Sequence, residues 1–430
     1  MILKPEKIDN LRSEQYRIIM KRSTEDIDSI YEEVRKIVLD VRDNGDQVAI
    51  DHYKKYKHDL TLKDLEVTKE DVEEAYRNVD SKVIDALKFA SENIAKFHHA
   101  QMEKEMWMID IADGIVAGRM TTPLERVGAY IPGRRAAYPS SILMTILPAK
   151  VAGVKEIVAC TPPDNGMTIN PSTIVAADIA GSTKIFKVGG PWGIASMAYG
   201  TRTIPKVNKI VGPGNKYVTA AKIIVFGQVG IDSPAGPSEG MILADKTGNA
   251  DFIAIDLLSQ SEHDPDAASI LVTTSDELAL TVSNKINKEL PKLPRKEIIT
   301  SSLTKHSYIL IARDLGQAID FVNEYAPEHL EIITEEPFVT LRKIKNAGSI
   351  FMGPFSPIPV GDYASGTNHV LPTGQTARMF SGLSVDDFIK KPTFQYLSKD
   401  GLSSLKDTVV TLAEAEGLPL HARTILERFK

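Results

Sequence analysis

Residues that can bind a metal or move a proton gather in three short stretches of the chain. Residues 259–266 read SQSEHDPD and residues 325–331 read YAPEHLE, so each places a glutamate directly before a histidine. Residues 346–369 form a glycine-rich run that presents Asp362, Ser365, Asn368 and His369. Polar loops after core strands often carry function, although Asp, Ser and Asn are also ordinary turn residues. Together the three stretches favour a functional site over three unrelated turns.

Four residues in or beyond these stretches form a candidate metal site. Gln260 and His263 stand three residues apart at the end of a predicted helix, so their side chains share one face. Asp362 and His421 can complete a set of nitrogen and oxygen donors without thiolate. Such a set suits Zn²⁺, with Mn²⁺ or Co²⁺ as alternatives. Because an amide is an unusual zinc ligand, spacing alone favours an ordinary helix-terminal role for Gln260.

Glu328 and His329 form a candidate acid–base pair. Histidine suits general-base work because its unperturbed pKa lies at ~6.5, and a neighbouring carboxylate raises that pKa. The two side chains follow Pro327 and need not point the same way, so each can serve a separate proton transfer. The alternative is a structural His–Glu pair at the start of a strand.

Two glycine turns that open helices form a candidate nucleotide site, at residues 188–198 and 211–222. A glycine turn at a helix N-terminus offers free backbone N–H groups and the positive end of the helix dipole, which suits a pyrophosphate. Neither turn has the G-x-G-x-x-G pattern of dinucleotide-binding folds. The alternative is a tight β–α turn that needs glycine only for packing.

Length and composition restrict the class of protein. With 430 residues and 43% hydrophobic content, the chain can form two to four domains. A net charge of -6 argues against a nucleic-acid partner. The single cysteine, Cys160, excludes an intrachain disulfide and a cysteine-based zinc site. No apolar run reaches the ~20 residues of a membrane span, so we expect a cytoplasmic protein without a membrane partner.

The predicted elements fall into three regions. Residues 1 to 107 show helical patterns rich in Lys and Glu, where the histidines are expected on solvated faces: His52, His58, His98 and His99. From Ile115 short β-branched runs alternate with helices, which predicts a parallel-sheet α/β domain. A second α/β passage covers residues 241–352, and two such halves would enclose a ligand cleft. The last fifty residues return to helix.

Several long blocks, in the same order, resemble the signature segments of the histidinol dehydrogenase family. These blocks are GPSEG (236–240), SQSEHDPDA, APEHLE, NAGS followed by GDYASGTNHVLPT, and EGLPLHA (416–422). The resemblance implies two Rossmann-like parallel-sheet domains with a helical N-terminal region, a helical C-terminal extension and an intertwined homodimer. The implied domains are an N-terminal helical arm (1–24), a first α/β domain with the metal and catalytic residues (25–129 plus 238–381), a second, nucleotide-binding α/β domain (130–237), and an extension that reaches the partner subunit (382–430).

The resemblance also implies an activity and residue roles. The family oxidises L-histidinol through L-histidinal to L-histidine with zinc and two NAD⁺, in the last steps of histidine biosynthesis. His329 matches the general base and Glu328 the residue that activates water. The matching metal ligands are Gln260, His263, Asp362 and His421, and the matching cofactor residues are Tyr130, Trp192 and Asn215. The matching substrate-binding residues are Ser238, Gln260, His263, His329, Asp362, Glu416 and His421, with His369 also at the pocket.

Two residues depart from the family's pattern. The family usually reads GGAQA where residues 189–193 read GGPWG, so Trp192 replaces a glutamine that contacts the cofactor. Arg134 stands where a second glycine is common, which adds charge and bulk near the expected nucleotide cleft. These changes leave cofactor affinity and the choice between NAD and NADP open.

Two other functions remain open from the sequence. A related zinc- and NAD-dependent dehydrogenase could oxidise another polar alcohol, which the altered cofactor loop would permit. A metal-dependent hydrolase could use Glu328 and the metal to activate water without a nicotinamide, although the two glycine turns weigh against it.

Overall fold

The computed structural model describes residues 2–22, 27–133, 137–233 and 236–430. Arg134, singled out above, lies outside these residues. The chain divides into two compact units, one of Met1–Gln101 and Glu125–Phe388 and one of Met102–Leu124 and Ile389–Lys430. Short 3₁₀ helices connect the main elements: η1 (Ile8–Asn10), η2 (Asp28–Ile30), η3 (Leu62–Leu65), η4 (Leu290–Lys292), η5 (Thr376–Arg378), η6 (Val385–Phe388) and η7 (Glu427–Phe429).

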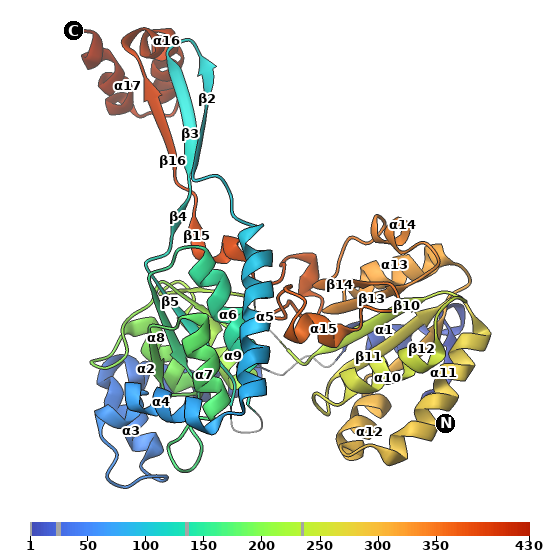
Figure 1. Ribbon diagram of the computed structural model, residues 1–430. Coiled ribbons are helices and arrows are strands. Elements are labelled where there is room, and N and C mark those ends of the chain that lie inside the picture. The colour runs from blue at the N-terminus through green and yellow to red at the C-terminus, as the bar shows by residue number, and fades with distance from the viewer. Residues whose placement is uncertain (1, 23–26, 134–136, 234–235) are drawn as a thin grey trace. The chain divides into compact units, whose positions relative to one another are not determined.

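The first unit contains a six-stranded parallel sheet of order β1-β12-β11-β10-β13-β14 (Figure 1). Its strands are β1 (Pro5–Lys7), β10 (Glu239–Ala244), β11 (Ala268–Thr273), β12 (Tyr308–Ile311), β13 (His329–Ile333) and β14 (Ser349–Met352). Its helices are α1 (Ser13–Lys21), α10 (Ala250–Ser261), α11 (Asp276–Glu289), α12 (Lys296–Lys305), α13 (Leu315–Tyr325), α14 (Pro337–Leu341) and α15 (Ile358–Tyr363).

Helices cover both faces of this sheet because its central strands are apolar on both sides. Along β10, Ile242 packs against α10, α11 and α12, whereas Met241 and Leu243 pack against α1 and α13. All six residues of β10 are buried. The predicted N-terminal helical arm of residues 1–24 contains α1, but it also contributes β1 to the sheet edge, paired with β12.

The same unit contains a five-stranded parallel sheet of order β7-β6-β5-β8-β9. Its strands are β5 (Arg126–Tyr130), β6 (Glu156–Cys160), β7 (Lys184–Phe186), β8 (Lys209–Val211) and β9 (Gly230–Ile231). Its helices are α6 (Pro139–Val151), α7 (Pro171–Ala180), α8 (Gly190–Tyr199) and α9 (Lys216–Val225). The predicted α/β class with two parallel sheets is confirmed.

Four N-terminal helices pack with the five-stranded sheet: α2 (Tyr31–Asn44), α3 (Asp46–Tyr53), α4 (Lys69–Asn78) and α5 (Ser81–His99). Val34, Val38 and Val41 of α2 join the same core cluster as residues of α8 and α9. The domain division implied by the resemblance instead places residues 25–129 with residues 238–381. The packing differs because the apolar stripe of α2 meets two helices, α8 and α9, most of whose residues are buried.

The second unit is a small antiparallel structure with two helices. Its three-stranded sheet has the order β16-β3-β2, from β2 (Met106–Ala112), β3 (Ile115–Met120) and β16 (Thr393–Leu397). A short ladder joins β4 (Thr122–Pro123) to β15 (Ile389–Lys390), and α16 (Lys399–Ala415) and α17 (Pro419–Leu426) follow. The predicted C-terminal extension of residues 382–430 is thus helical only in part, since two of its segments are strands.

None of the described helices is both long enough and apolar enough to span a membrane.

Candidate active site

His329 is the first residue of β13, and the strand holds its imidazole in a defined orientation. The ring is 4% exposed, and its Nδ1 lies 3.0 Å from the carbonyl oxygen of Glu239 on the neighbouring β10. A carbonyl only accepts, so Nδ1 carries a proton in either charge state and Nε2 is the nitrogen that gains or loses the second proton. Nε2 is buried without a hydrogen-bond partner in the described part of the chain, and Asp362 Oδ1 lies 3.6 Å away. This nitrogen is therefore placed to accept a proton.

The charges around His329 favour its protonated form. Burial lowers the pKa of the imidazole, but the negative charges of Glu328 and Asp362 oppose this effect and raise the pKa well above its ordinary value. A proton taken up at Nε2 is consequently stabilised by carboxylates on both sides of the ring.

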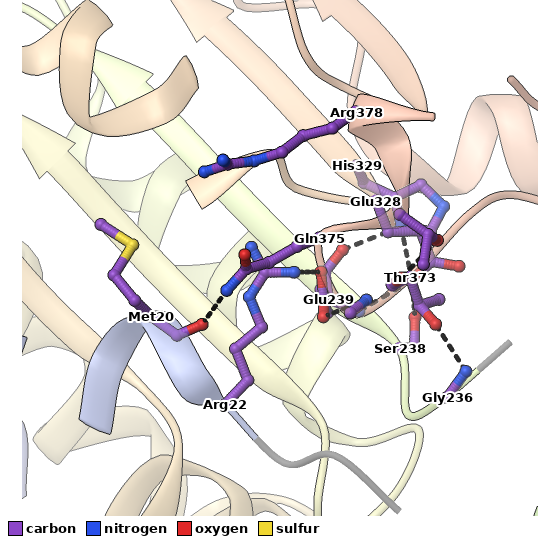
Figure 2. A network of polar contacts seen from close by, with 12 residues as sticks. Met20, Arg22, Gly236, Ser238, Glu239, Glu328, His329, Thr373, Gln375 and Arg378 are labelled. Carbon is purple, nitrogen blue, oxygen red and sulfur yellow. Dashed lines mark hydrogen bonds and ion pairs between the residues drawn. The ribbon is translucent and has the colours of Figure 1, made fainter. Parts of the chain in front are cut away.

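Glu328 faces His329, whereas the sequence left their directions open. Its Oε2 accepts hydrogen bonds from Ser238 Oγ at 2.9 Å and from the Glu239 backbone N–H at 2.8 Å. The same oxygen lies 3.4 Å from His329 Nδ1. Figure 2 shows Ser238 and Glu239 side by side with the two catalytic candidates. The start of β10 thus fixes both side chains.

Gln260 extends this network from the end of α10. Its Nε2 donates to Ser238 Oγ at 2.8 Å, and the side chain is 3% exposed. A Cβ at Gly240 would lie 2.7 Å from Gln260 Cγ, so the last glycine of the GPSEG block makes room for the amide. Hydrogen bonds therefore connect Gln260 through Ser238 to Glu328.

Asp362 lies in the short helix α15 among three imidazoles. Burial raises the pKa of its carboxyl, but the His329 imidazole, whose Nε2 lies 3.6 Å from Oδ1, and the charges of His369 and His263 outweigh that effect and lower it. His369 Nδ1 bonds to the backbone oxygen of Asp362 at 2.8 Å, and its Nε2 lies 3.1 Å from Ser141 Oγ. His369 therefore holds the Asp362 backbone in place.

The predicted metal ligands offer nitrogen and oxygen donors of the types that zinc binds. Gln260 uses its amide nitrogen for Ser238, which leaves the amide oxygen for a cation, and Asp362 is held ionised. His263 is exposed and close enough to influence Asp362. His421 lies in the second unit, where it is exposed, as is Glu416. Among the described residues no three His, Cys, Asp or Glu side chains converge as a metal site.

A cavity of about 1230 Å³ brings the three predicted cofactor residues together. Tyr130, Trp192 and Asn215 all line it, and this volume is large enough for a dinucleotide. The Trp192 ring stacks on His52 of α3, with centroids 3.6 Å apart and planes at 26°. His52 was expected on a solvated face, but it is half-buried because its ring stacks on Trp192.

The glycine turn before α8 does not offer the free N–H groups that the sequence predicted. The backbone N–H of Gly189 donates to the Tyr53 hydroxyl at 2.9 Å, and that of Gly190 donates to the Tyr130 hydroxyl at 3.0 Å. These bonds hold the turn at the cavity wall. Tyr130 thus has a structural contact as well as a place in the cavity lining.

The glycine turn before α9 is held by a buried ion pair. The Gly212 N–H donates to Asp232 Oδ2 at 2.7 Å, and Lys222 Nζ, ion-paired with Asp232, donates to the Gly212 carbonyl at 3.1 Å. Gly212 has a φ of 117°, and a Cβ there would collide with the carbonyl oxygen of Tyr130. Asn215 Oδ1 accepts the N–H groups of the first turn of α9, so this residue caps the helix.

Sequence reasoning missed a buried ion pair behind the site. Arg22 Nη1 lies 2.6 Å from Glu239 Oε2, with side chains 2% and 5% exposed, and the guanidinium stacks 3.5 Å from the Tyr325 ring centre (Figure 2). Glu239 also accepts the Gly374 N–H at 2.9 Å. Glu239 belongs to the GPSEG block, so the sequence pointed to this part of the site. Nothing in the helical sequence around Arg22 marked that side chain as buried.

Two parallel sheets, a buried imidazole–carboxylate pair and a large cavity are features of an α/β enzyme. The sequence profile described as histidinol dehydrogenase matches residues 20–429. The chain belongs to the histidinol dehydrogenase family.

Relatives of known name share this family over nearly their whole length. The histidinol dehydrogenase of Methanocaldococcus jannaschii is 50% identical over 430 residues, which cover 100% of this chain and 99% of the relative. That of Clostridium acetobutylicum is 49% identical over 422 residues, 98% of this chain and 97% of the relative. The crystal structure of histidinol dehydrogenase from Elizabethkingia anophelis superposes with a TM-score of 0.94 at 39% identity, covering 100% of this chain and 98% of that one.

Proposed function

We propose that this protein is a zinc-dependent, NAD-linked L-histidinol dehydrogenase. It oxidises L-histidinol through L-histidinal to L-histidine in the cytoplasm, in the last steps of histidine biosynthesis. The observation that carries the proposal is the buried Nε2 of His329 in a member of this family. The Glu239 carbonyl orients the imidazole, and Nε2 has no hydrogen-bond partner in the described part of the chain.

His329 acts as the general base in the first oxidation. Its Nε2 takes the hydroxyl proton of the alcohol as the carbinol carbon loses a hydride to NAD⁺. Glu328, 3.4 Å from Nδ1, stabilises the imidazolium that results. The donors on Glu328 Oε2, Ser238 and the Glu239 N–H, keep that carboxylate in place.

Glu328 acts in the second oxidation by accepting a proton from water. The water oxygen bonds to the carbonyl carbon of L-histidinal and forms a gem-diol. After His329 has released its first proton to solvent, the gem-diol loses a hydride to a second NAD⁺ and a proton to His329, which gives the acid. Each L-histidinol thus yields two NADH.

Gln260, His263, Asp362 and His421 of the partner subunit would hold the zinc ion. A bound zinc ion supplies positive charge that holds the amino and imidazole nitrogens of the substrate. The side chains of Ser238 and of His369 line the substrate pocket. Glu416 of the partner subunit would accept a hydrogen bond from the substrate's amino group.

Tyr130, Trp192 and Asn215 would contact the dinucleotide in the cavity that they share. Among the described residues, three carboxylates line this cavity, those of Glu33, Asp264 and Asp266, against one lysine, Lys216. Negative charge disfavours the 2′-phosphate of NADP⁺ and suits the ribose hydroxyls of NAD⁺. This lining supports NAD⁺ as the cofactor.

The exposed surface of the second unit supports a homodimer. All seven residues of β2 are exposed, among them Met108 at 61% and Ile111 at 60%, and so is Leu420 of α17 at 69%. A set of this kind is unusual on a monomer and typical of an interface. Burial against a second copy would bring Glu416 and His421 to the partner's site.

Steady-state assays test the proposal. Zinc-loaded protein is mixed with L-histidinol and either NAD⁺ or NADP⁺, and NADH absorbance is compared with L-histidine formed. We expect two NADH for each L-histidine, a preference for NAD⁺, and loss of activity after chelation. A faster rate with another amino alcohol would identify a different alcohol dehydrogenase. Hydrolysis without NADH would identify a hydrolase.

A further inference from the structure

Glu331 is a buried carboxyl beneath the site that the proposed mechanism does not use. It stands two residues after His329 on β13, so both side chains point to the same face of the sheet. It is 1% exposed, and its Oε1 accepts the backbone N–H of Ile358 at 3.0 Å. Ile358 is the first residue of α15, whose own N-cap residue, Pro357, gives no side-chain cap. Glu331 therefore caps the helix that carries Asp362.

Asp256 lies beside Glu331 and connects it to α10. Asp256 is one helical turn before Gln260, so the two share a face of α10. Glu331 Oε2 is buried and accepts no hydrogen bond from the described residues. Burial and the neighbouring Asp256 charge raise the pKa of Glu331, and burial raises the pKa of Asp256. With Glu331 buried and Asp256 half-buried, this approach of two carboxyls favours a shared proton over two negative charges.

We propose that Asp256 and Glu331 are a positioning pair that fixes Gln260, His329 and Asp362 relative to one another. Each of the three elements joined by the pair carries one of these residues: α10, β13 and α15. Gln260 and Asp362 are metal ligands only under the proposed function, and the inference rests on it to that extent. Neither carboxyl touches the substrate in this scheme.

The test compares two substitutions at Glu331. Glu331→Gln keeps an oxygen acceptor for Ile358 and an amide that can donate to Asp256, whereas Glu331→Leu fills the space without an acceptor. Hydrogen–deuterium exchange of residues 354–366 is measured on metal-free protein. Zinc affinity is measured by competition with a chelator. We expect Glu331→Leu to exchange faster in this segment and to bind zinc about 10- to 100-fold more weakly, the usual effect of losing support behind a metal ligand.

Conservative variants and a surface control make the result decisive. Glu331→Gln and Asp256→Asn should each keep slow exchange in this segment and a zinc affinity close to that of the original protein. Glu297→Leu makes the same substitution at an exposed position of α12 and should change neither quantity. Slow exchange in Glu331→Leu, or equal losses in Glu331→Gln and Glu331→Leu, would overturn the positioning pair. Because exchange is read without metal, absence of zinc binding in the original protein would instead refute the proposed function.

Discussion

At the scale of single residues, a continuous set of contacts runs through the site. Gln260 donates to Ser238, Ser238 donates to Glu328, and Glu328 lies beside His329. Local motifs pointed to Glu328 and His329, whereas Ser238 and Gln260 were singled out by the family resemblance, because spacing alone favoured an ordinary helix-terminal role for Gln260. Glu331 and Arg22 were not predicted, since a lone acid in an apolar strand and a lone Arg in a charged helix carry no local sign of burial.

Substitutions at the acid–base pair should separate the two oxidations. We expect His329→Asn to slow both by about 10²- to 10⁴-fold, because the change removes the imidazole that accepts the alcohol proton. Glu328→Gln should mainly slow the conversion of aldehyde to acid. It should slow the first oxidation less, because the amide still accepts the bonds from Ser238 and Glu239. Supplying L-histidinal directly isolates the second step, and equal losses in both steps would contradict this division.

Trp192 should control how tightly the nucleotide binds. The indole stacks on His52 and offers the ligand one N–H donor, whereas a glutamine amide both donates and accepts. One added hydrogen bond contributes about 0.5–1.5 kcal/mol, so Trp192→Gln should lower the Kd for NAD⁺ by about two- to tenfold. Titration calorimetry measures the change. Trp107→Gln, in the second unit, is the control and should leave the Kd for NAD⁺ unchanged. An unchanged Kd for Trp192→Gln would show that Trp192 does not belong to the nucleotide site.

At the scale of elements, the sequence pattern predicted which helices and strands form better than it predicted which of them pack together. The alternation of strands and helices gave two parallel sheets, since that pattern depends on local sequence. It did not predict that α2 to α5 pack with the five-stranded sheet, because an apolar stripe does not specify which other apolar surface will cover it. The contribution of β1 to the sheet edge was missed for the same reason: its three residues are too short to show a pattern.

His98 shows how a helix can hide a polar residue that the sequence places in solvent. It is fully buried on α5, with Nδ1 2.7 Å from the Ile94 carbonyl and Nε2 3.4 Å from Asn368 Nδ2. The Asn368 amide also donates to the Met144 carbonyl at 2.7 Å. An imidazole between a carbonyl and an amide donor is satisfied only when neutral. The expectation of a solvated His98 is therefore wrong.

Acid should destabilise the fold through His98. Burial lowers its pKa below the ordinary value of ~6.5, so the unfolded chain binds the proton first as pH falls. The stabilising contribution is thus complete above pH ~6.5 and is lost as pH falls toward the folded-state pKa. Chemical unfolding between these limits should show this slope in the free energy of unfolding, and His98→Gln should flatten it. His99→Gln alters an exposed neighbour and should leave the slope intact; a flattened slope there would contradict the assignment.

At the scale of the whole molecule, the second unit has an exposed apolar surface that its own residues do not cover. Its three-stranded sheet presents apolar side chains on β2 and on β16, where Tyr396 is 68% exposed, and α16 adds Leu412 at 59%. A unit of this size has little interior of its own: only three small residues, Gly401, Ala413 and Ala422, are buried in its two helices. Covering this surface with a second copy would stabilise both chains.

Mixed dimers should decide whether His421 serves the partner's site. We expect His263→Asn and His421→Asn chains each to be inactive alone. If His421 acts in trans, a heterodimer of the two contains one site with both defects and one site with neither. Activity should then reappear on coexpression, at about half of the original activity per dimer, because its two sites are independent in this scheme. If His421 acts in cis, every site keeps one defect, and purified heterodimers without recovered activity would exclude the shared site.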